Sequence, residues 1–323
     1  MTFRFTHLLL ALALSAGATA TQAGPYTVTV MDLAGADGVQ GWDINNQGDF
    51  VGSATLNGVT VGYVRNGANS TILNGPAGAL GAFALGISDG GTVVGSYFTV
   101  NGGFPNNGFV YNAGNYTTLS YPGAVGTQLR GISADGRYIT GYANNADSST
   151  TAFVYDSNSG QFKAIATGRS FTLAQGVTNA GLVMGHRRLT GPSRRVGTSY
   201  DLSTATLSDF SVPGSFNTNY RGINEAGLID GWFVDANGST HGFIGTAAVH
   251  ELFDVVGATD TYLEGINDAG WLSGAFVDGA GVTHAFLARP VSEPAAWALL
   301  LAALGCVSAV RRRRACKMLG SGL

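Results

Sequence analysis

One stretch of the chain carries arginines whose spacing could bind an anion. Residues 186–195 read HRRLTGPSRR, with Arg187 and Arg188 before a Gly-Pro turn and Arg194 and Arg195 after it. If the two flanks pair as a hairpin, four guanidinium groups gather at one loop, and guanidinium binds carboxylate or sulfate through parallel hydrogen bonds. We favour a solvated hairpin here, and the alternative is a site that binds an acidic polysaccharide.

Four carboxylates stand where they could act in pairs. Asp235, Asp260, Glu264 and Asp278 lie in or beside connections that open on one face of the architecture derived below. Two carboxyl groups at a suitable separation can hydrolyse a glycosidic bond. No Gly-x-Ser-x-Gly motif, Ser/His/Asp order or phosphate loop occurs. We therefore predict no catalytic residue, and a secreted carbohydrate-active enzyme, a glycosidase or lyase, stays as the alternative.

Metal binding has two weak candidates. His241 and His284 occupy one position in two neighbouring repeats, but a metal site needs three or four converging ligands. DSNSG at residues 156–160 resembles the start of a calcium loop, lacks the later bidentate Glu, and is also a typical hairpin tip. Both cysteines, Cys306 and Cys316, lie near the C-terminal end. We predict no metal and no cofactor.

The composition indicates a β-rich, turn-rich chain. Charged residues make up 11% of the sequence and 49 residues are glycine, whereas helical surfaces usually carry many Glu and Lys side chains. Several basic residues lie near the two ends, so the body between them is more acidic than the net charge of −3 suggests. An acidic body without a basic stripe argues against binding to nucleic acid.

The elements that position these side chains come from a sixfold repeat. A hydrophobic residue recurs about every 44 residues and is followed by Asn, Ser or Thr and then by a turn glycine. The hydrophobic column contains Ile44, Ile87, Ile132, Val177, Ile223 and Ile266. A second glycine column contains Gly52, Gly95, Gly141, Gly185, Gly231 and Gly274. The aromatic column contains Tyr63, Phe109, Phe153, Tyr200, Phe243 and Phe286.

The third copy shows the repeat unit most clearly. TQLRGIS, RYITGYA, TAFVYD and QFKAIA are apolar runs between turn residues, which is the signal of successive hairpins. Four antiparallel strands per repeat predict an all-β, six-bladed β-propeller over residues 24–290. The sixth copy lacks its fourth strand, and YTVTVMDLAGADG, from Tyr26, resembles the fourth strands of other copies. We expect this N-terminal strand to pair beside residues 285–288 and close the last blade.

Two columns have both a structural and a binding interpretation. The aromatic column could stack sugars or pack each blade against the next, and we favour packing because large apolar residues dominate such cores. The Asn/Ser/Thr column could hold a ligand in a central channel or hydrogen-bond neighbouring turn backbone. We favour the second interpretation.

Both ends of the chain have the pattern of targeting segments. Residues 1–23 combine Arg4, a short apolar run and small residues, which predicts a secretory signal peptide. Residues 295–310 carry no charge and predict a transmembrane helix, after which Arg311, Arg312, Arg313 and Arg314 would remain cytoplasmic. The motif before this helix is Val291, Ser292, Glu293 and Pro294.

This tail, residues 291–323, resembles the PEP-CTERM sorting signal of Gram-negative bacteria, with Ser292 in place of the first proline. The resemblance implies processing by exosortase, a membrane protease or transpeptidase, in bacteria that secrete exopolysaccharide. The repeats resemble the HAF family of extracellular repeats, named for His-Ala-Phe as at residues 284–286, and THGF at residues 240–243 also matches. That resemblance implies an exported repeat protein without an established reaction.

These features predict an exported protein of the cell surface or extracellular matrix that is transiently anchored in the membrane through residues 295–310. We expect a non-catalytic binding or scaffolding module, with exosortase and an acidic exopolysaccharide as its partners.

Overall fold

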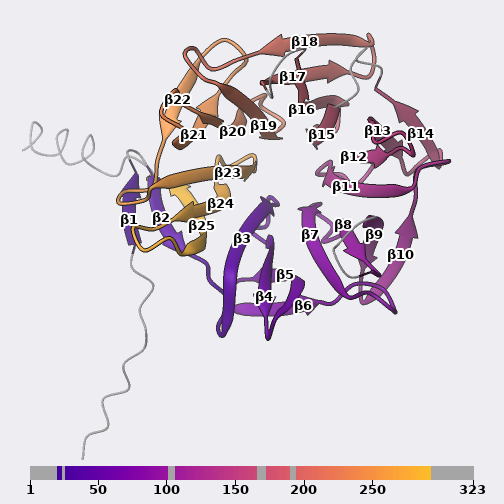
Figure 1. Ribbon diagram of the computed structural model, residues 1–323, viewed down its shortest axis with the longest axis horizontal. Helices are drawn as coiled ribbons and strands as arrows, with labels where there is room; N and C mark the ends of the chain where they lie inside the picture. The colour runs from indigo at the N-terminus through magenta and orange to yellow at the C-terminus, as the bar shows by residue number, and fades with distance from the viewer. Residues whose placement is uncertain (1–19, 24–25, 101–105, 166–171, 190–193, 292–323) are drawn as a thin grey trace, which may run out of the picture.

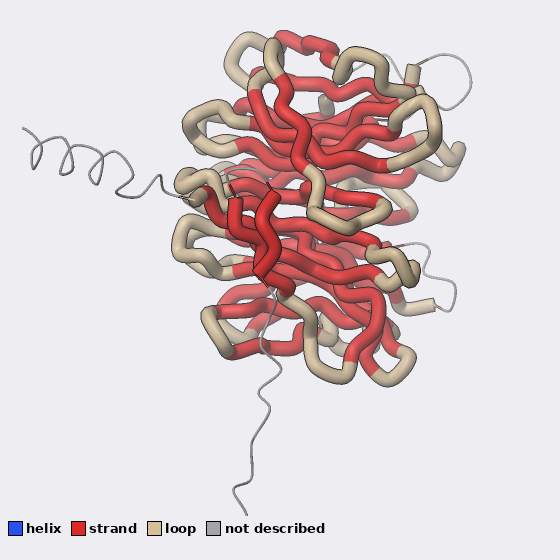
Figure 2. The backbone as a smooth tube through the Cα atoms, turned by 90° about the vertical axis from the view of Figure 1, so that its left-hand side faces the viewer, coloured by secondary structure: helices blue, strands red, loops and turns tan. Residues whose placement is uncertain are grey.

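The computed structural model describes residues 20–23, 26–100, 106–165, 172–189 and 194–291. Six antiparallel sheets follow one another around a central axis (Figure 1), which confirms the predicted six-bladed β-propeller. Seen from the side, the strands run between two faces at which turns gather (Figure 2). Among these residues no helix is long and apolar enough to cross a membrane.

The predicted signal peptide up to residue 19 and the tail from Ser292 onward lie outside the described residues. This part of the chain includes the predicted membrane helix, the four arginines after it, and most of the sorting motif. Within the motif only Val291 is described, directly after the last strand.

Blades 1 to 5 each consist of four consecutive strands. Blades 1 to 3 contain β3 (Ala36–Ile44), β4 (Phe50–Leu56), β5 (Val59–Asn66), β6 (Asn69–Leu73), β7 (Gly81–Ile87), β8 (Val93–Phe98), β9 (Asn106–Asn112), β10 (Asn115–Leu119), β11 (Gly126–Ile132), β12 (Tyr138–Asn144), β13 (Thr150–Asp156) and β14 (Gln161–Ala164). Blades 4 and 5 contain β15 (Thr172–Val177), β16 (Leu182–Arg188), β17 (Arg195–Asp201), β18 (Thr206–Phe210), β19 (Asn217–Ile223), β20 (Ile229–Val234), β21 (Thr240–Gly245) and β22 (His250–Phe253).

Blade 6 combines the two ends of the ring. It contains β23 (Asp260–Ile266), β24 (Leu272–Val277), β25 (Thr283–Pro290), β2 (Tyr26–Val30) and β1 (Ala20–Ala23). β2 pairs antiparallel with β25 and sets Val28 opposite Ala288, as the incomplete sixth repeat predicted. β1, at the end of the predicted signal peptide, adds a fifth strand outside β2. β1, β2 and β25 lie side by side in Figure 1.

The aromatic column packs in the hydrophobic core rather than on a ligand surface. Tyr63, Phe109, Phe153, Phe243 and Phe286 are each at most 1% exposed. Each lies opposite a residue of the second glycine column in the neighbouring strand. Glycine is needed there because an added Cβ would overlap the backbone of the inner strand. The packing interpretation of these five aromatic residues is therefore confirmed.

Blade 4 departs from the predicted alignment. Tyr200 lies opposite Val183, whereas the residue opposite Gly185 is Thr198. The assignment of Tyr200 to the aromatic column was therefore wrong, because the equivalent position is Thr198, two residues earlier. The hairpin connection sets which residues pair, so equal spacing along the sequence did not give equal positions in the sheet.

The Asn/Ser/Thr column holds the turns between the first two strands of each blade. Its side-chain oxygens accept the backbone amide that closes each turn, as in Asn45 with Asp49 at 2.8 Å and Thr178 with Leu182 at 3.1 Å. These turns lie at one face, here called the lower face, and the opposite one is the upper face. The predicted bonding to turn backbone is confirmed.

Hydrogen bonds also link these turns into a closed ring at the lower face. Each turn donates a backbone amide to an oxygen of the next turn, for example Asn179 to Glu225 Oε1 at 2.8 Å and Glu225 to Asp268 Oδ1 at 2.8 Å. The ring closes where the amide of Asp268 donates to Asn46 Oδ1 at 2.8 Å. The first and last blades are therefore joined at this face as well as through β2.

Candidate functional site

The inner strands turn one residue of each blade toward the central channel. The strand register shifts at the same place in all six inner strands, just before the hydrophobic column. A β-bulge re-aims the extra side chain, and here that side chain lines the channel. The bulged residues are Trp42, Leu85, Arg130, Gln175, Arg221 and Glu264, and they surround a cavity of about 70 Å³.

Arg221 and Glu264 form a buried ion pair between blades 5 and 6. Arg221 Nε lies 3.0 Å from Glu264 Oε2, and the two side chains are 10% and 7% exposed. Trp232 donates its indole N–H to Glu264 Oε1 at 3.2 Å, and its ring centre lies 5.4 Å from the Arg221 guanidinium carbon. Burial raises the pKa of Glu264, and the two arginines of the channel oppose that rise. Both oxygens of Glu264 therefore already have partners.

Arg130 lies in the same channel without a carboxylate partner. Its Nε donates to Gln175 Oε1 at 2.9 Å, and its guanidinium carbon lies 5.2 Å from the centre of the Trp42 ring. It forms no ion pair with any residue that the structure describes. Burial, and then repulsion by Arg221, lowers the pKa of Arg130 to about 10. Its guanidinium is thus still charged at neutral pH.

Two further acids lie close to the channel and are held by backbone amides. Asp43 stands where the other inner strands have glycine, and it accepts the amides of Ile44 at 2.8 Å and Ile87 at 3.0 Å. Burial raises the pKa of Asp43 to about 7, although these hydrogen bonds lower it. Asp230 accepts the amide of Gly222 at 2.7 Å, and burial raises its pKa well above the usual value. Both oxygens of Asp43 thus hold backbone amides, whereas Asp230 uses only Oδ1, and its Oδ2 has no hydrogen-bond partner among the described residues.

A larger cavity of about 290 Å³ opens beside Arg130, between blades 1, 2 and 3. Its described lining consists of Trp42, Phe83, Leu85, Ser96, Phe98, Asn106, Gln128 and Arg130. Because Phe98 ends β8 and Asn106 begins β9, this cavity lies toward the upper face, opposite the inner turns. We call it the upper cavity. None of the described residues that line it is a carboxylate.

The amide groups of the upper cavity have defined orientations. Gln128 Oε1 accepts the Tyr142 hydroxyl at 2.6 Å, which leaves the NH₂ group of Gln128 available. Asn106 is 5% exposed, and its buried Oδ1 has no hydrogen-bond donor among the described residues. The described lining of the cavity therefore combines aromatic walls with the Arg130 guanidinium and the side chains of Ser96, Asn106 and Gln128.

The four arginines of the predicted anion loop do not form one cluster of free cations. Arg187 is bound to Asp209, with Nε donating to Oδ1 at 2.9 Å. Arg195 is half-buried, and its Nη1 lies 3.5 Å from Asn219 Oδ1. Arg188 and Arg194 are exposed, and Arg188 is opposite Arg195 in the hairpin. The predicted hairpin is present, but only part of its charge faces solvent.

The four carboxylates that the enzyme alternative would use make different contacts. Asp235 and Asp278 cap their own loops, where they accept the amides of Ser239 and Val282 at 2.9 and 2.8 Å. Asp260 accepts the amide of Thr240 at 2.9 Å. Of the four, only Glu264 lines the central channel.

The two histidines join strands within their own blades. His241 Nδ1 lies 2.8 Å from Asp254 Oδ2, and His284 Nδ1 lies 2.7 Å from Asp32 Oδ2. His284 Nε2 also faces Asp278 Oδ2 at 3.4 Å. Over the described ranges, no group of three or more His, Cys, Asp and Glu residues has the arrangement of a metal site.

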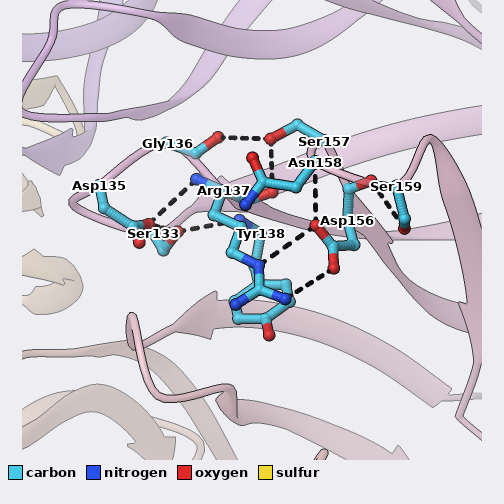
Figure 3. Close-up of polar contacts among 9 residues, drawn as sticks. All are labelled: Ser133, Asp135, Gly136, Arg137, Tyr138, Asp156, Ser157, Asn158 and Ser159. Carbon is cyan, nitrogen blue, oxygen red and sulfur yellow. Dashed lines mark hydrogen bonds and ion pairs between the residues drawn. The ribbon is translucent and has the colours of Figure 1, made fainter.

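The calcium-like loop is a turn held by an arginine. Figure 3 shows Asp156 accepting hydrogen bonds from Arg137 through both carboxylate oxygens. The distances are 3.2 Å from Nε to Oδ1 and 2.9 Å from Nη2 to Oδ2. Asp156 Oδ1 also accepts the amide of Asn158 at 3.0 Å, and Ser157 Oγ donates to the carbonyl of Arg137 at 2.8 Å. The carboxylate that would begin a calcium loop is therefore already occupied by a cation of the chain.

The comparisons with known proteins agree with the fold. No protein family and no curated protein matches the sequence. Among solved structures, TolB from Acinetobacter baumannii superposes with a TM-score of 0.51 at 10% identity, over 78% of this chain and 65% of that one. A lectin from Aleuria aurantia superposes with a TM-score of 0.50 at 15% identity, over 83% of this chain and 100% of the lectin.

A sialidase from Trypanosoma rangeli superposes with a TM-score of 0.52 at 10% identity, over 80% of this chain and 55% of the sialidase. This chain therefore spans about two thirds of the length of TolB and about half that of the sialidase. The likeness extends to the β-propeller fold, which binding proteins and enzymes share.

Proposed function

We propose that this protein is an exported, non-catalytic propeller of the cell surface or extracellular matrix that binds an exopolysaccharide. The upper cavity is the observation that carries the proposal. Small-ligand sites are mostly apolar hollows with a few well-placed polar groups, and this one offers Phe83, Phe98 and Trp42 as walls with amides between them. Flat apolar ring faces beside amide groups suit a sugar ring and its hydroxyls.

The absence of carboxylates from the described lining of the upper cavity favours binding over hydrolysis. Glycoside hydrolysis generally uses two carboxyl groups on either side of the scissile bond. The carboxyl groups near the channel, Asp43, Asp230 and Glu264, each accept bonds from the protein itself. A variant of the Aleuria aurantia lectin was solved in complex with a fucose-containing disaccharide, and the sialidase in complex with an inhibitor, so a binding protein and an enzyme have the same fold.

The proposed function includes export of the chain and removal of its C-terminal tail. The predicted signal peptide would direct the chain across the inner membrane, and the tail that resembles PEP-CTERM would hold it there until exosortase acts at or near Glu293–Pro294. Arg188 and Arg194, which are exposed, would add a weak surface attraction for an acidic polysaccharide. Such contacts between exposed charges are screened by salt.

Binding of the purified full chain to an array of neutral and acidic glycans tests the proposed function. The Phe83→Ala variant should weaken binding at least about tenfold, because it removes an aromatic wall of the cavity. Phe216→Ala is the matched control, since Phe216 is 50% exposed and does not line the cavity. The absence of binding to any glycan would contradict the proposal. Release of reducing sugar that Glu264→Gln abolishes would favour the carbohydrate-active enzyme instead.

A further inference from the structure

Arg130 is a cation that forms no ion pair with any described residue, although Glu264 lies close enough to act on it. Arg130 is partly buried beside Trp42 and Gln175, and a charge withdrawn from water is costly unless it is paired. Arg221, the other arginine of the channel, is paired with Glu264. Arg130 lines both cavities, so an anion entering from the upper cavity could reach its guanidinium.

The orientation of Arg130 restricts what such an anion can be. The bond from Nε to Gln175 Oε1 and the Trp42 ring beside the guanidinium fix this group, so its Nη atoms are the ones left for a ligand. The same bond fixes the Gln175 amide, which lines the central channel and whose buried Nε2 has no acceptor among the described residues. A planar guanidinium matches a carboxylate through parallel hydrogen bonds.

The charges nearby favour a single negative charge over a phosphate. Glu264 lies close enough to act on Arg130, and Asp43 lines the same central channel. A dianion would be repelled by these acids, whereas a carboxylate adds only one charge. The upper cavity, at about 290 Å³, is near the lower end of the usual range for small-ligand sites.

We propose that the upper cavity binds one carboxylated sugar unit, of the hexuronic acid type, with its carboxylate on Arg130 and its ring between Trp42, Phe83 and Phe98. The proposal rests on the proposed function and adds to it the recognised unit and the residue that selects it. In this arrangement the sugar hydroxyls accept from the Gln128 amide and lie beside the Asn106 side chain.

The experiment compares the methyl glycosides of glucuronic acid and galacturonic acid with those of glucose and galactose. Binding to the full chain is followed by calorimetry and by saturation-transfer NMR. We expect the acidic sugars to bind at least about tenfold tighter, which corresponds to about 1.4 kcal/mol. The preference should persist at about 1 M salt, where the Debye length is about 3 Å, because enclosed pairs are screened less than exposed ones.

Three variants locate the effect. Arg130→Met should remove the preference for acidic sugars and leave neutral sugars bound. Asn106→Asp keeps Arg130 and the side-chain shape but adds a negative charge to the cavity, so it should lower acidic binding selectively. Lys163→Ser is the control, because Lys163 is an exposed cation on the outer strand β14.

The outcomes separate this inference from the proposed function. Equal binding of neutral and acidic sugars would overturn the selection by Arg130 and leave glycan binding intact. Failure to bind any sugar would contradict both. If Arg130→Met does not fold, the Asn106→Asp result decides, and unchanged acidic preference in that variant overturns the assignment to this cavity.

Discussion

His284 Nδ1 lies 2.7 Å from Asp32 Oδ2, although the two residues are 252 positions apart in the chain. The other oxygen of Asp32 accepts the amide of Ala285 at 3.1 Å. The same contact occurs in blade 5, where His241 meets Asp254 within one continuous repeat. In blade 6 the His–Asp contact therefore joins the two ends of the ring, whereas in blade 5 it joins two parts of one continuous repeat.

The Asp32–His284 contact should make ring closure depend on pH. The hydrogen bond and charge of Asp32 raise the pKa of His284. A raised histidine pKa stabilises the folded state fully below the unfolded value of about 6.5, and this stabilisation is lost as pH rises through the folded pKa. Asp32→Asn should lower the melting temperature by about 2 °C at pH 6 and by much less at pH 9. Thermal unfolding across pH checks this, and a penalty independent of pH would refute it.

The N-terminal strand should be needed for a closed ring. Deleting residues 20–33 removes β1, β2 and Asp32 and leaves β25 with an unpaired edge. Such an edge beside an uncovered apolar surface promotes aggregation, which light scattering and size-exclusion chromatography would detect. Deleting only residues 20–23 should leave a monomer, because β2 still covers β25. A monomeric longer deletion with the parent melting temperature would disprove closure by β2.

The second glycine column should tolerate no side chain. In Gly274→Ala the new Cβ would overlap the carbonyl oxygen of Tyr262, whereas in Gly279→Ala it would meet no atom within 4 Å. We expect Gly274→Ala to lower the free energy of unfolding by about 2 to 3 kcal/mol and Gly279→Ala to leave it nearly unchanged. Chemical denaturation measures both. Equal stability of the two variants would show that the inner strand can move away.

The exposed arginines should contribute a salt-sensitive attraction for polyanions. Replacing Arg188 and Arg194 with serine should reduce retention on an acidic glycan matrix at low salt and change the melting temperature by less than about 2 °C, because exposed charges contribute little to stability. At about 1 M salt the variant and the parent protein should be retained equally, because salt screens exposed charges. Chromatography over a salt gradient tests this, and unchanged retention at low salt would exclude the loop as a binding surface.

The tail should be removed during export. Intact-mass analysis of the secreted protein should show a chain that ends at or near Glu293–Pro294 and lacks the four arginines. Restoring the usual motif with Ser292→Pro should leave the cleavage site unchanged and increase the secreted fraction. Recovery of the full-length chain only in membranes would instead indicate a permanent anchor.

The fold was predictable because each repeat in the sequence corresponds to one blade. Columns of glycine, aromatic and Asn/Ser/Thr residues mark strand pairs and turns, and the incomplete sixth repeat indicated the circular closure that β2 provides. The exception was blade 4, where Tyr200 was misplaced. Its position depends on how the β16–β17 hairpin pairs, and spacing along the chain does not encode that register.

The candidate site was largely missed, because it arises where the repeats differ. Arg130, Gln175 and Arg221 occupy a bulged position that no motif marks, and the bulge alone turns them to the axis. A signal was present: Arg-Gly-Ile in the third copy and again in the fifth places a charge within an otherwise apolar inner strand. Glu264 was noted as an acid, but its partner was not. The ion pair of Glu264 with Arg221 joins two blades, and the distance between side chains of different blades cannot be read from the sequence of one repeat.

The end of β25 determines how the ring would stand on a membrane. Pro290 lies beside Gly270 in the inner turn of blade 6, so the chain leaves the ring at the lower face. The upper cavity lies at the opposite face, where β8 ends and β9 begins. A molecule tethered by the residues after Pro290 would therefore hold its cavity outward, away from the lipid. A polymer could then be captured while the protein is still attached to the cell.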